Sequence, residues 1–177
     1  MSRMRYVYRE SENMGKEDEK IRIDIMDQEN EYKAWLAYSK MDYECAVYLN
    51  EAPMHPRPLN IICYHCQQAA EKAAKALVVY YGSPGGMAKK HSVEIQFIQI
   101  RKILKADKGI DIPEEIITKS AEISMYASEP RYPNELVVEE QDVNRALQDS
   151  RAIIDWVTRT IESPSIMADT PEIDSKV

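Results

Sequence analysis

LNIICYHCQQAAEKAAKALVVYYG, residues 59–82, is the stretch of sequence that decides the fold. At 100° per residue its apolar side chains fall on one face of a helix, and four of the eight residues on that face are alanine or cysteine. Such small residues allow a neighbouring helix to approach closely. The spacing predicts a helix over 59–81, ended by Gly82 and followed by a turn at 83–86. Its packing face comprises Leu59, Ile62, Cys66, Ala69, Ala70, Ala73, Leu77 and Tyr80.

Helical spacing of apolar residues recurs on both sides of this stretch. It predicts further helices over about 31–50, 92–105, 113–126 and 139–162, separated by connections rich in proline or glycine. Five helices without a convincing core strand predict an all-α, up-and-down bundle. Ser92 is a good N-cap, and Pro113 suits the first position of a helix. In 31–50 the recurring apolar residues are Trp35, Tyr38, Met41, Cys45, Tyr48 and Leu49.

The two ends of the chain differ from this pattern. Residues 1–30 are rich in charges of both signs, which is typical of a disordered extension. The alternation of Ile21, Ile23 and Ile25 with charged residues instead favours a short strand or an extended arm. Residues 163–177 form a polar tail. The predicted division is therefore an extension over 1–30, a helical bundle over 31–162 and a tail over 163–177.

The bulk composition excludes several classes of protein. The formal charge of −7 over 177 residues argues against a nucleic-acid binder that uses its whole surface, which would normally be basic, so direct nucleic-acid binding is not expected, although the charge leaves room for a local basic patch. No apolar run reaches the roughly 18 residues that a membrane-spanning helix needs. The basic N-terminus, residues 1–9, has no apolar segment after it, so a secretory signal is not expected. Three cysteines do not make a disulfide framework, and we infer a cytoplasmic protein.

A polar stripe on the 59–81 helix is the first candidate site. His65, Gln68, Lys72 and Lys75 fall within about 80° of one another, and two ammonium groups with an imidazole and an amide could hold a phosphate or a nucleotide. The stripe could equally be a solvated helix face, or it could bind the loop that contains Arg131. Lys75 also has the i,i+4 spacing for an ion pair with Glu71.

The second candidate is Arg131-Tyr132, which lies between Pro130 and Pro133. Because the prolines restrict the backbone on both sides, the loop is expected to be stiff. Arg131 could clamp a phosphate while Tyr132 stacks on a base. Alternatively, Arg131 could form a buried ion pair with Glu71 and lock the loop to the helix.

The Cys63-x-x-Cys66 spacing, with His65 between the cysteines, suggests a metal site at first sight. A structural zinc site needs four ligands, and both cysteines project toward the apolar side of the helix. We expect them to be buried packing residues, and we predict neither a metal nor a cofactor.

Three segments together resemble a known family. They are the helix from Cys63 to Leu77, the Lys90-His91-Ser92 segment, and Arg131-Tyr132-Pro133. The combination is similar to the HEPN family (higher eukaryotes and prokaryotes nucleotide-binding) over roughly Glu31 to Ile161. The resemblance implies an up-and-down helical bundle that commonly forms a homodimer. It also implies a possible partner, since many members are encoded beside a minimal nucleotidyltransferase in toxin–antitoxin systems.

One departure from the family bears on activity. RNase members of the family carry an arginine followed, after four to six residues, by a histidine, which serve in phosphate stabilisation and acid–base chemistry. The three histidines of this chain, His55, His65 and His91, do not follow an arginine at that spacing. The resemblance is therefore to the branch without the RNase motif, and no catalytic residue is predicted. A non-catalytic interaction module is the first hypothesis, a nucleotide- or phosphate-binding domain the second, and a degenerate RNase toxin the third.

Overall fold

The computed structural model describes residues 16–82, 92–127 and 137–162, and all regular structure in these ranges is helical. This confirms the predicted all-α bundle. The helices of the described ranges are α2 (Lys16–Glu51), α3 (Leu59–Tyr80), α4 (Val93–Lys108), α5 (Glu114–Ser124) and α6 (Glu140–Glu162).

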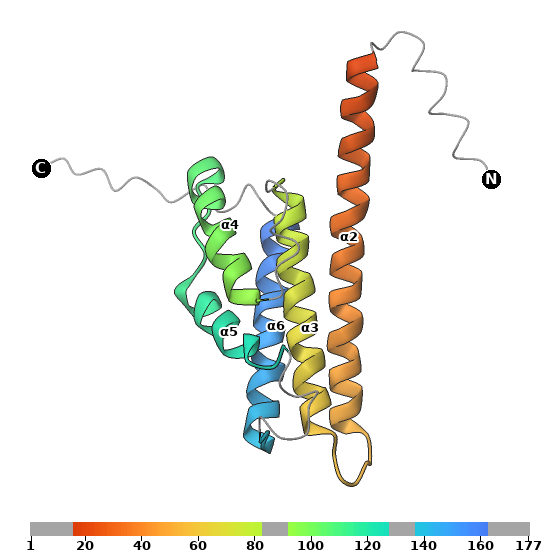
Figure 1. The fold of residues 1–177 in the computed structure, drawn as a ribbon, viewed down its shortest axis with the longest axis vertical. Coiled ribbons are helices and arrows are strands. Elements are labelled where there is room, and N and C mark those ends of the chain that lie inside the picture. The colour runs from red at the N-terminus through yellow and green to blue at the C-terminus, as the bar shows by residue number, and fades with distance from the viewer. Residues whose placement is uncertain (1–15, 83–91, 128–136, 163–177) are drawn as a thin grey trace, which may run out of the picture.

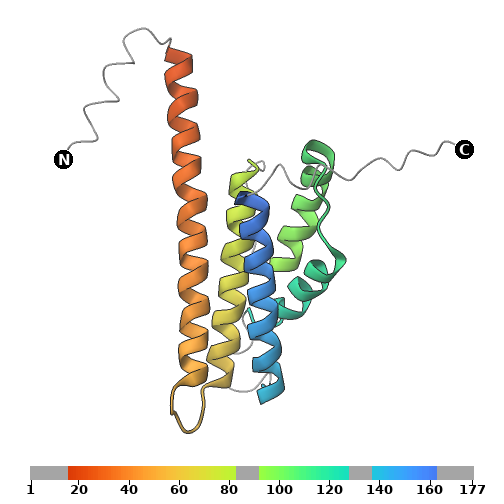
Figure 2. The ribbon, with the colours of Figure 1, turned by 180° about the vertical axis from the view of Figure 1, so that it is seen from behind.

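Helix α3 is the centre of the bundle, and it contacts α2, α4, α5 and α6. Helix α2 lies along one side of α3, α6 lies beside α3, and the shorter α4 and α5 cover the side away from α2 (Figure 1). The same arrangement is visible from behind in Figure 2. One flank of α2 consequently faces away from every other helix.

The packing face predicted for α3 is the buried face. Its alanines Ala69, Ala70 and Ala73 are completely inaccessible to solvent. Burial extends well beyond that face, because α3 has neighbours on several sides. Additional buried residues of α3 are Cys63, Gln67, Glu71, Ala74, Lys75, Ala76 and Val78.

Only part of the apolar set predicted for the 31–50 helix packs inward: Trp35 and Leu49 are partly buried against the core. Tyr38, Met41 and Tyr48 are exposed, whereas Ser39 and Ala46 are fully buried. The hydroxyl of Ser39 donates a hydrogen bond of 2.7 Å to the carbonyl oxygen of Ala69. Two small residues therefore face the alanine face of α3, because only small side chains permit such a close approach of two helix backbones.

Helix α2 begins at Lys16, well before the expected start at residue 31. The strand and the disordered segment considered for residues 16–30 are both wrong. The sequence from 16 to 51 contains neither glycine nor proline and is rich in good helix formers, so nothing interrupts the helix. The first turns project beyond the end of the bundle (Figures 1 and 2), which means that local preferences hold them in a helix.

The predicted helix ends are largely confirmed. The side chain of Ser92 caps α4 by accepting a hydrogen bond of 3.4 Å from the backbone N–H of Ile95. Gly82, just beyond α3, has φ 67°, a left-handed conformation that glycine adopts without steric cost. Pro113 directly precedes α5 as its N-cap residue, and the acidic Glu114 and Glu115 lie in the first turn.

The α2–α3 contact yields a first prediction. Ser39→Ala is expected to lower the free energy of unfolding by about 1 kcal/mol, because it removes one buried hydrogen bond without adding volume. Ser39→Leu is expected to lower it by about 1–3 kcal/mol, or more, because the larger side chain would push the two helices apart. Urea denaturation followed by circular dichroism measures both. Equal stability of the two variants would contradict the close approach of α2 and α3.

Candidate functional site

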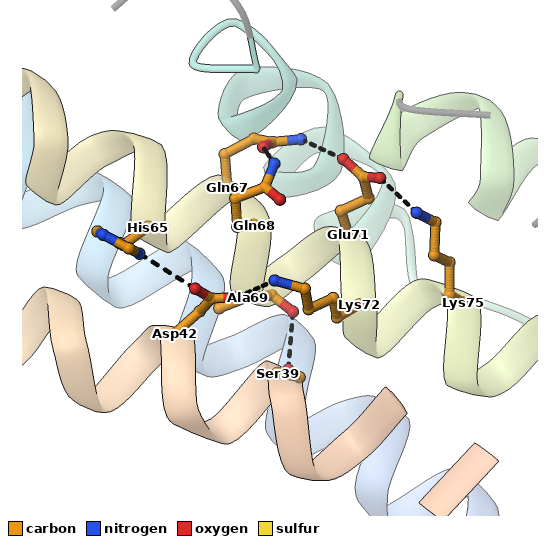
Figure 3. Close-up of polar contacts among 9 residues, drawn as sticks. All are labelled: Ser39, Asp42, His65, Gln67, Gln68, Ala69, Glu71, Lys72 and Lys75. Atoms are coloured by element: carbon orange, nitrogen blue, oxygen red, sulfur yellow. Dashed lines mark hydrogen bonds and ion pairs between the residues drawn. The ribbon is translucent and has the colours of Figure 1, made fainter. Parts of the chain in front are cut away.

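A polar cluster joins α2 to α3, and its centre is Asp42 of α2. His65 Nδ1 lies 3.1 Å from one carboxylate oxygen of Asp42, and the ammonium group of Lys72 donates to the other oxygen (Figure 3). All three side chains are partly buried, with about a fifth of each accessible. The two basic groups of α3 thus converge on one carboxylate.

A second polar chain runs along α3, and it is more deeply buried. Gln68 donates to the side-chain oxygen of Gln67 at 2.7 Å, and the amide of Gln67 donates to Glu71 at 3.0 Å. The ammonium group of Lys75 donates to the other oxygen of Glu71 at 2.7 Å, as Figure 3 shows.

Lys75 also lies over the indole ring of Trp35, with 5.0 Å between Nζ and the ring centroid. The ion pair and the cation–π contact together compensate the charge of Lys75, which is 8 % exposed.

The four residues of the predicted stripe are therefore divided between two networks. His65 and Lys72 meet at Asp42, whereas Gln68 and Lys75 belong to the buried chain with Glu71. The i,i+4 ion pair predicted between Glu71 and Lys75 is confirmed. Arg131 and Tyr132 lie outside the described residues, so their proposed contacts stay predictions.

Sequence reasoning missed the residue that organises the cluster. Asp42 lies at helical spacing from Ser39 and Ala46, and at 100° per residue the three fall within about 60° of one another. A serine, an aspartate and an alanine on one face resemble a solvated surface. Only the complementary alanine face of α3 identifies that face of α2 as the packed one.

Cys63 and Cys66 are buried packing residues, as expected, and both are free thiols with no accessible surface. Burial raises the pKa of each thiol to about 12. Cys45 of α2 is also a free thiol, and it is partly exposed. In the described part of the chain, no three His, Cys, Asp or Glu side chains are grouped so that they could hold a metal ion.

These environments predict different thiol reactivities. Because burial raises the pKa of Cys63 and Cys66 to about 12, both thiols stay protonated at pH 8, and the same burial keeps reagents away from them. Iodoacetamide is expected to modify Cys45 in the folded protein and all three cysteines in urea, with peptide mass spectrometry as the measurement. Labelling of Cys63 or Cys66 as fast as Cys45 in the folded protein would contradict the buried packing.

A groove of about 510 Å³ lies between α2 and α6. On its α6 side, the guanidinium of Arg151 lies 5.8 Å from the ring centroid of Tyr43 and donates to Asp155 at 2.8 Å. Because Arg151 is already paired within the chain, the groove has no strong excess of positive charge. Its lining residues are Lys40, Tyr43, Glu44, Val47, Tyr48, Glu51, Arg151, Ile154, Asp155 and Thr158.

Comparison with known proteins identifies the family. The family model for the HEPN domain matches residues 32–161, which is most of the chain and nearly the predicted span. The chain belongs to the HEPN domain family. No curated protein matches the chain.

Two solved structures share the HEPN fold of this chain. One is ST0689, an archaeal HEPN homologue, with a TM-score of 0.56 and 20 % identity over 73 % of this chain and 97 % of that one. The other is TT1696 from Thermus thermophilus, with a TM-score of 0.58 and 20 % identity over 73 % of this chain and 98 % of that one. At this identity the likeness shows the fold alone.

The HEPN match covers the bundle and leaves out the first half of α2, which is the part that projects from it. The helix with the Cys63–Leu77 motif is the central helix α3 of this HEPN domain. Within the described ranges, no helix is both long enough and apolar enough to cross a bilayer.

Proposed function

We propose that the protein is a non-catalytic HEPN interaction module that acts in the cytoplasm as a homodimer. In this proposal it is the partner of a minimal nucleotidyltransferase in a toxin–antitoxin-like pair. The absence of the RNase spacing of arginine and histidine from the sequence supports the non-catalytic role. The proposal extends the family assignment to a specific branch.

One observation carries the proposal. The conspicuous polar side chains of α3 are bonded within the chain, whereas the outer flank of α2 exposes large apolar residues. His65 and Lys72 bind Asp42, and Lys75 binds Glu71. Polar groups that already bind one another support a structural role, and an aligned apolar flank supports contact with protein.

The test combines an activity assay with a partner assay. The purified chain is incubated with total RNA and with nucleoside triphosphates, and products are followed by electrophoresis and chromatography. It is also co-expressed with the nucleotidyltransferase from a neighbouring gene, where one is present, and co-purification is measured. We expect no turnover and a stable complex. Clear turnover by a monomeric protein would overturn the proposal, and growth arrest with RNA cleavage on expression would favour an RNase toxin.

A phosphate- or nucleotide-binding function is the second candidate. In its favour, His65 and Lys72 already converge on an oxyanion, the carboxylate of Asp42, and both are partly accessible. A phosphate would have to displace Asp42 from these two groups. Calorimetric titration with a panel of nucleotides tests this function, and no heat at millimolar ligand would count strongly against it.

A further inference from the structure

The outer flank of α2 carries a continuous apolar stripe, defined here as Tyr38, Met41, Cys45 and Tyr48. Met41 is 61 % exposed and Tyr48 is 73 % exposed. At 100° per residue the four side chains fall within about 80°, and their centre lies about 130° from the face that packs on α3. Single exposed apolar residues are common, but alignment over three turns is typical of a contact surface.

The spacing of the stripe is symmetric along the chain. Its residues are separated by steps of three, four and three, which is the heptad pattern of helix–helix contacts. A two-fold axis perpendicular to α2 at the level of Tyr43 would place Tyr38 opposite Tyr48 of a second copy. The same axis would place Met41 opposite Cys45 of the second copy. Each contact would occur twice, as a two-fold interface requires.

Charged residues beside the stripe favour the same arrangement. Lys33, Lys40, Glu44 and Glu51 lie on one flank of it, within about 40° of one another, and the last three also line the groove between α2 and α6. In the antiparallel arrangement Lys40 lies near Glu44 of the second copy, offset by about two residues or roughly 3 Å along the axis. Lys33, which bonds to Glu29 within its own chain, lies near Glu51 of the second copy at the same offset.

In a parallel arrangement in register, this flank of the two copies would lie on opposite sides of the contact, so these charges could not pair with one another. Ion pairs between these residues are therefore available only in the antiparallel arrangement.

We propose that this stripe is the contact surface for a second copy of the chain, with the two α2 helices antiparallel about Tyr43. The inference rests on the homodimer proposed above and assigns its face and direction. Three large apolar side chains per copy bury less than the roughly 800 Å² per partner of a standard interface, so the flanking ion pairs are part of the contact. Because such exposed ion pairs are screened by salt, the dimer weakens as ionic strength rises.

The first test measures self-association of the full chain by sedimentation equilibrium. Met41→Glu is expected to raise the dimer dissociation constant by about 100-fold, because each dimer loses two apolar contacts and gains two buried charges. Met125→Glu is the matched control: Met125 is 55 % exposed and directly follows α5, on the other side of the bundle, so the dimer should persist. Lys40→Glu should weaken the dimer, and Lys40→Glu combined with Glu44→Lys should restore it.

The second test determines direction by cross-linking. In a Cys45→Ala background, Tyr38→Cys and Tyr48→Cys chains are oxidised separately and as a mixture. A covalent dimer that forms only when the two variants are mixed supports the antiparallel register. Efficient formation of a covalent dimer in either variant on its own overturns it.

The outcomes separate the two proposals. A full chain that stays monomeric at the highest concentration reached overturns both the homodimer and its face. A dimer that is insensitive to Met41→Glu overturns the face alone. A monomer that binds a nucleotidyltransferase through the stripe also overturns self-association, while it leaves the interaction-module function intact.

Discussion

Replacing Glu71 with alanine is expected to lower the free energy of unfolding by about 3–5 kcal/mol, because the substitution leaves the ammonium group of Lys75 buried without its counter-charge. Glu71 and Lys75 are both buried, and Glu71 also accepts a hydrogen bond from Gln67. The variant therefore loses the hydrogen bond from Gln67 as well as the hydrogen-bonded ion pair with Lys75. Urea denaturation, followed by circular dichroism at 222 nm, measures the loss.

The chain provides a matched control for this experiment. Glu29 and Lys33 of α2 form an ion pair with the same residue types and the same i,i+4 spacing, but more than half of each side chain is exposed. Glu29→Ala is expected to change the free energy of unfolding by less than about 0.5 kcal/mol. If the two glutamate variants are equally stable, burial of the ion pair is not the reason that Glu71 contributes to stability.

A double variant isolates the charge. Glu71→Leu combined with Lys75→Met removes both charges and keeps most of the apolar volume, so it is expected to recover most of the stability lost in Glu71→Ala. A double variant as unstable as Glu71→Ala would mean that the loss comes from packing and from Gln67.

The second large effect is expected at Phe97, the single phenylalanine of the chain. Its side chain has no accessible surface and lies edge-on to the ring of Trp156, with 5.9 Å between the centroids. Phe97→Ala is expected to cost about 3–5 kcal/mol of unfolding free energy, because a cavity forms and an aromatic contact is lost. Thermal unfolding, with tryptophan fluorescence as a second probe, measures this cost.

The neighbouring residue of α4 serves as the comparison. Ile98 is 46 % exposed, so Ile98→Ala removes little buried surface and is expected to stay within about 0.5 kcal/mol of wild type. Similar losses of unfolding free energy in both variants would show that any alanine substitution in α4 destabilises the protein. The loss in Phe97→Ala would then not come from the contact between Phe97 and Trp156.

The sequence alone was sufficient to predict the helical bundle, the packing face of α3 and the buried cysteines. These features depend on local signals: apolar spacing near 3.6 residues, N-caps such as Ser92, and glycine at a left-handed position such as Gly82. The ion pair between Glu71 and Lys75 was predictable for the same reason, since i,i+4 neighbours on a helix are close in any fold.

The candidate site was less predictable, because its residues come from two helices. Spacing along α3 groups His65, Lys72 and Lys75 on one stripe, but the structure assigns His65 and Lys72 to Asp42 of α2 and buries Lys75 beside Trp35. Whether a polar residue meets solvent or a partner depends on which neighbouring helix covers it. A single helix does not contain that information.

Helix α2 shows most clearly which features the sequence determines and which the tertiary structure decides. Its sequence determines that it is helical, that Tyr38, Met41 and Tyr48 lie on one side, and that the small residues Ser39 and Ala46 lie on another side with Trp35 and Leu49. Only the tertiary structure decides which of the two packs on α3. The alanine face of α3 accepts a backbone at close range, so the small face of α2 is buried and the large apolar side chains Tyr38, Met41 and Tyr48 remain outside. The size complementarity of the two helices, in addition to the hydrophobicity of α2, therefore determined which side of α2 is buried.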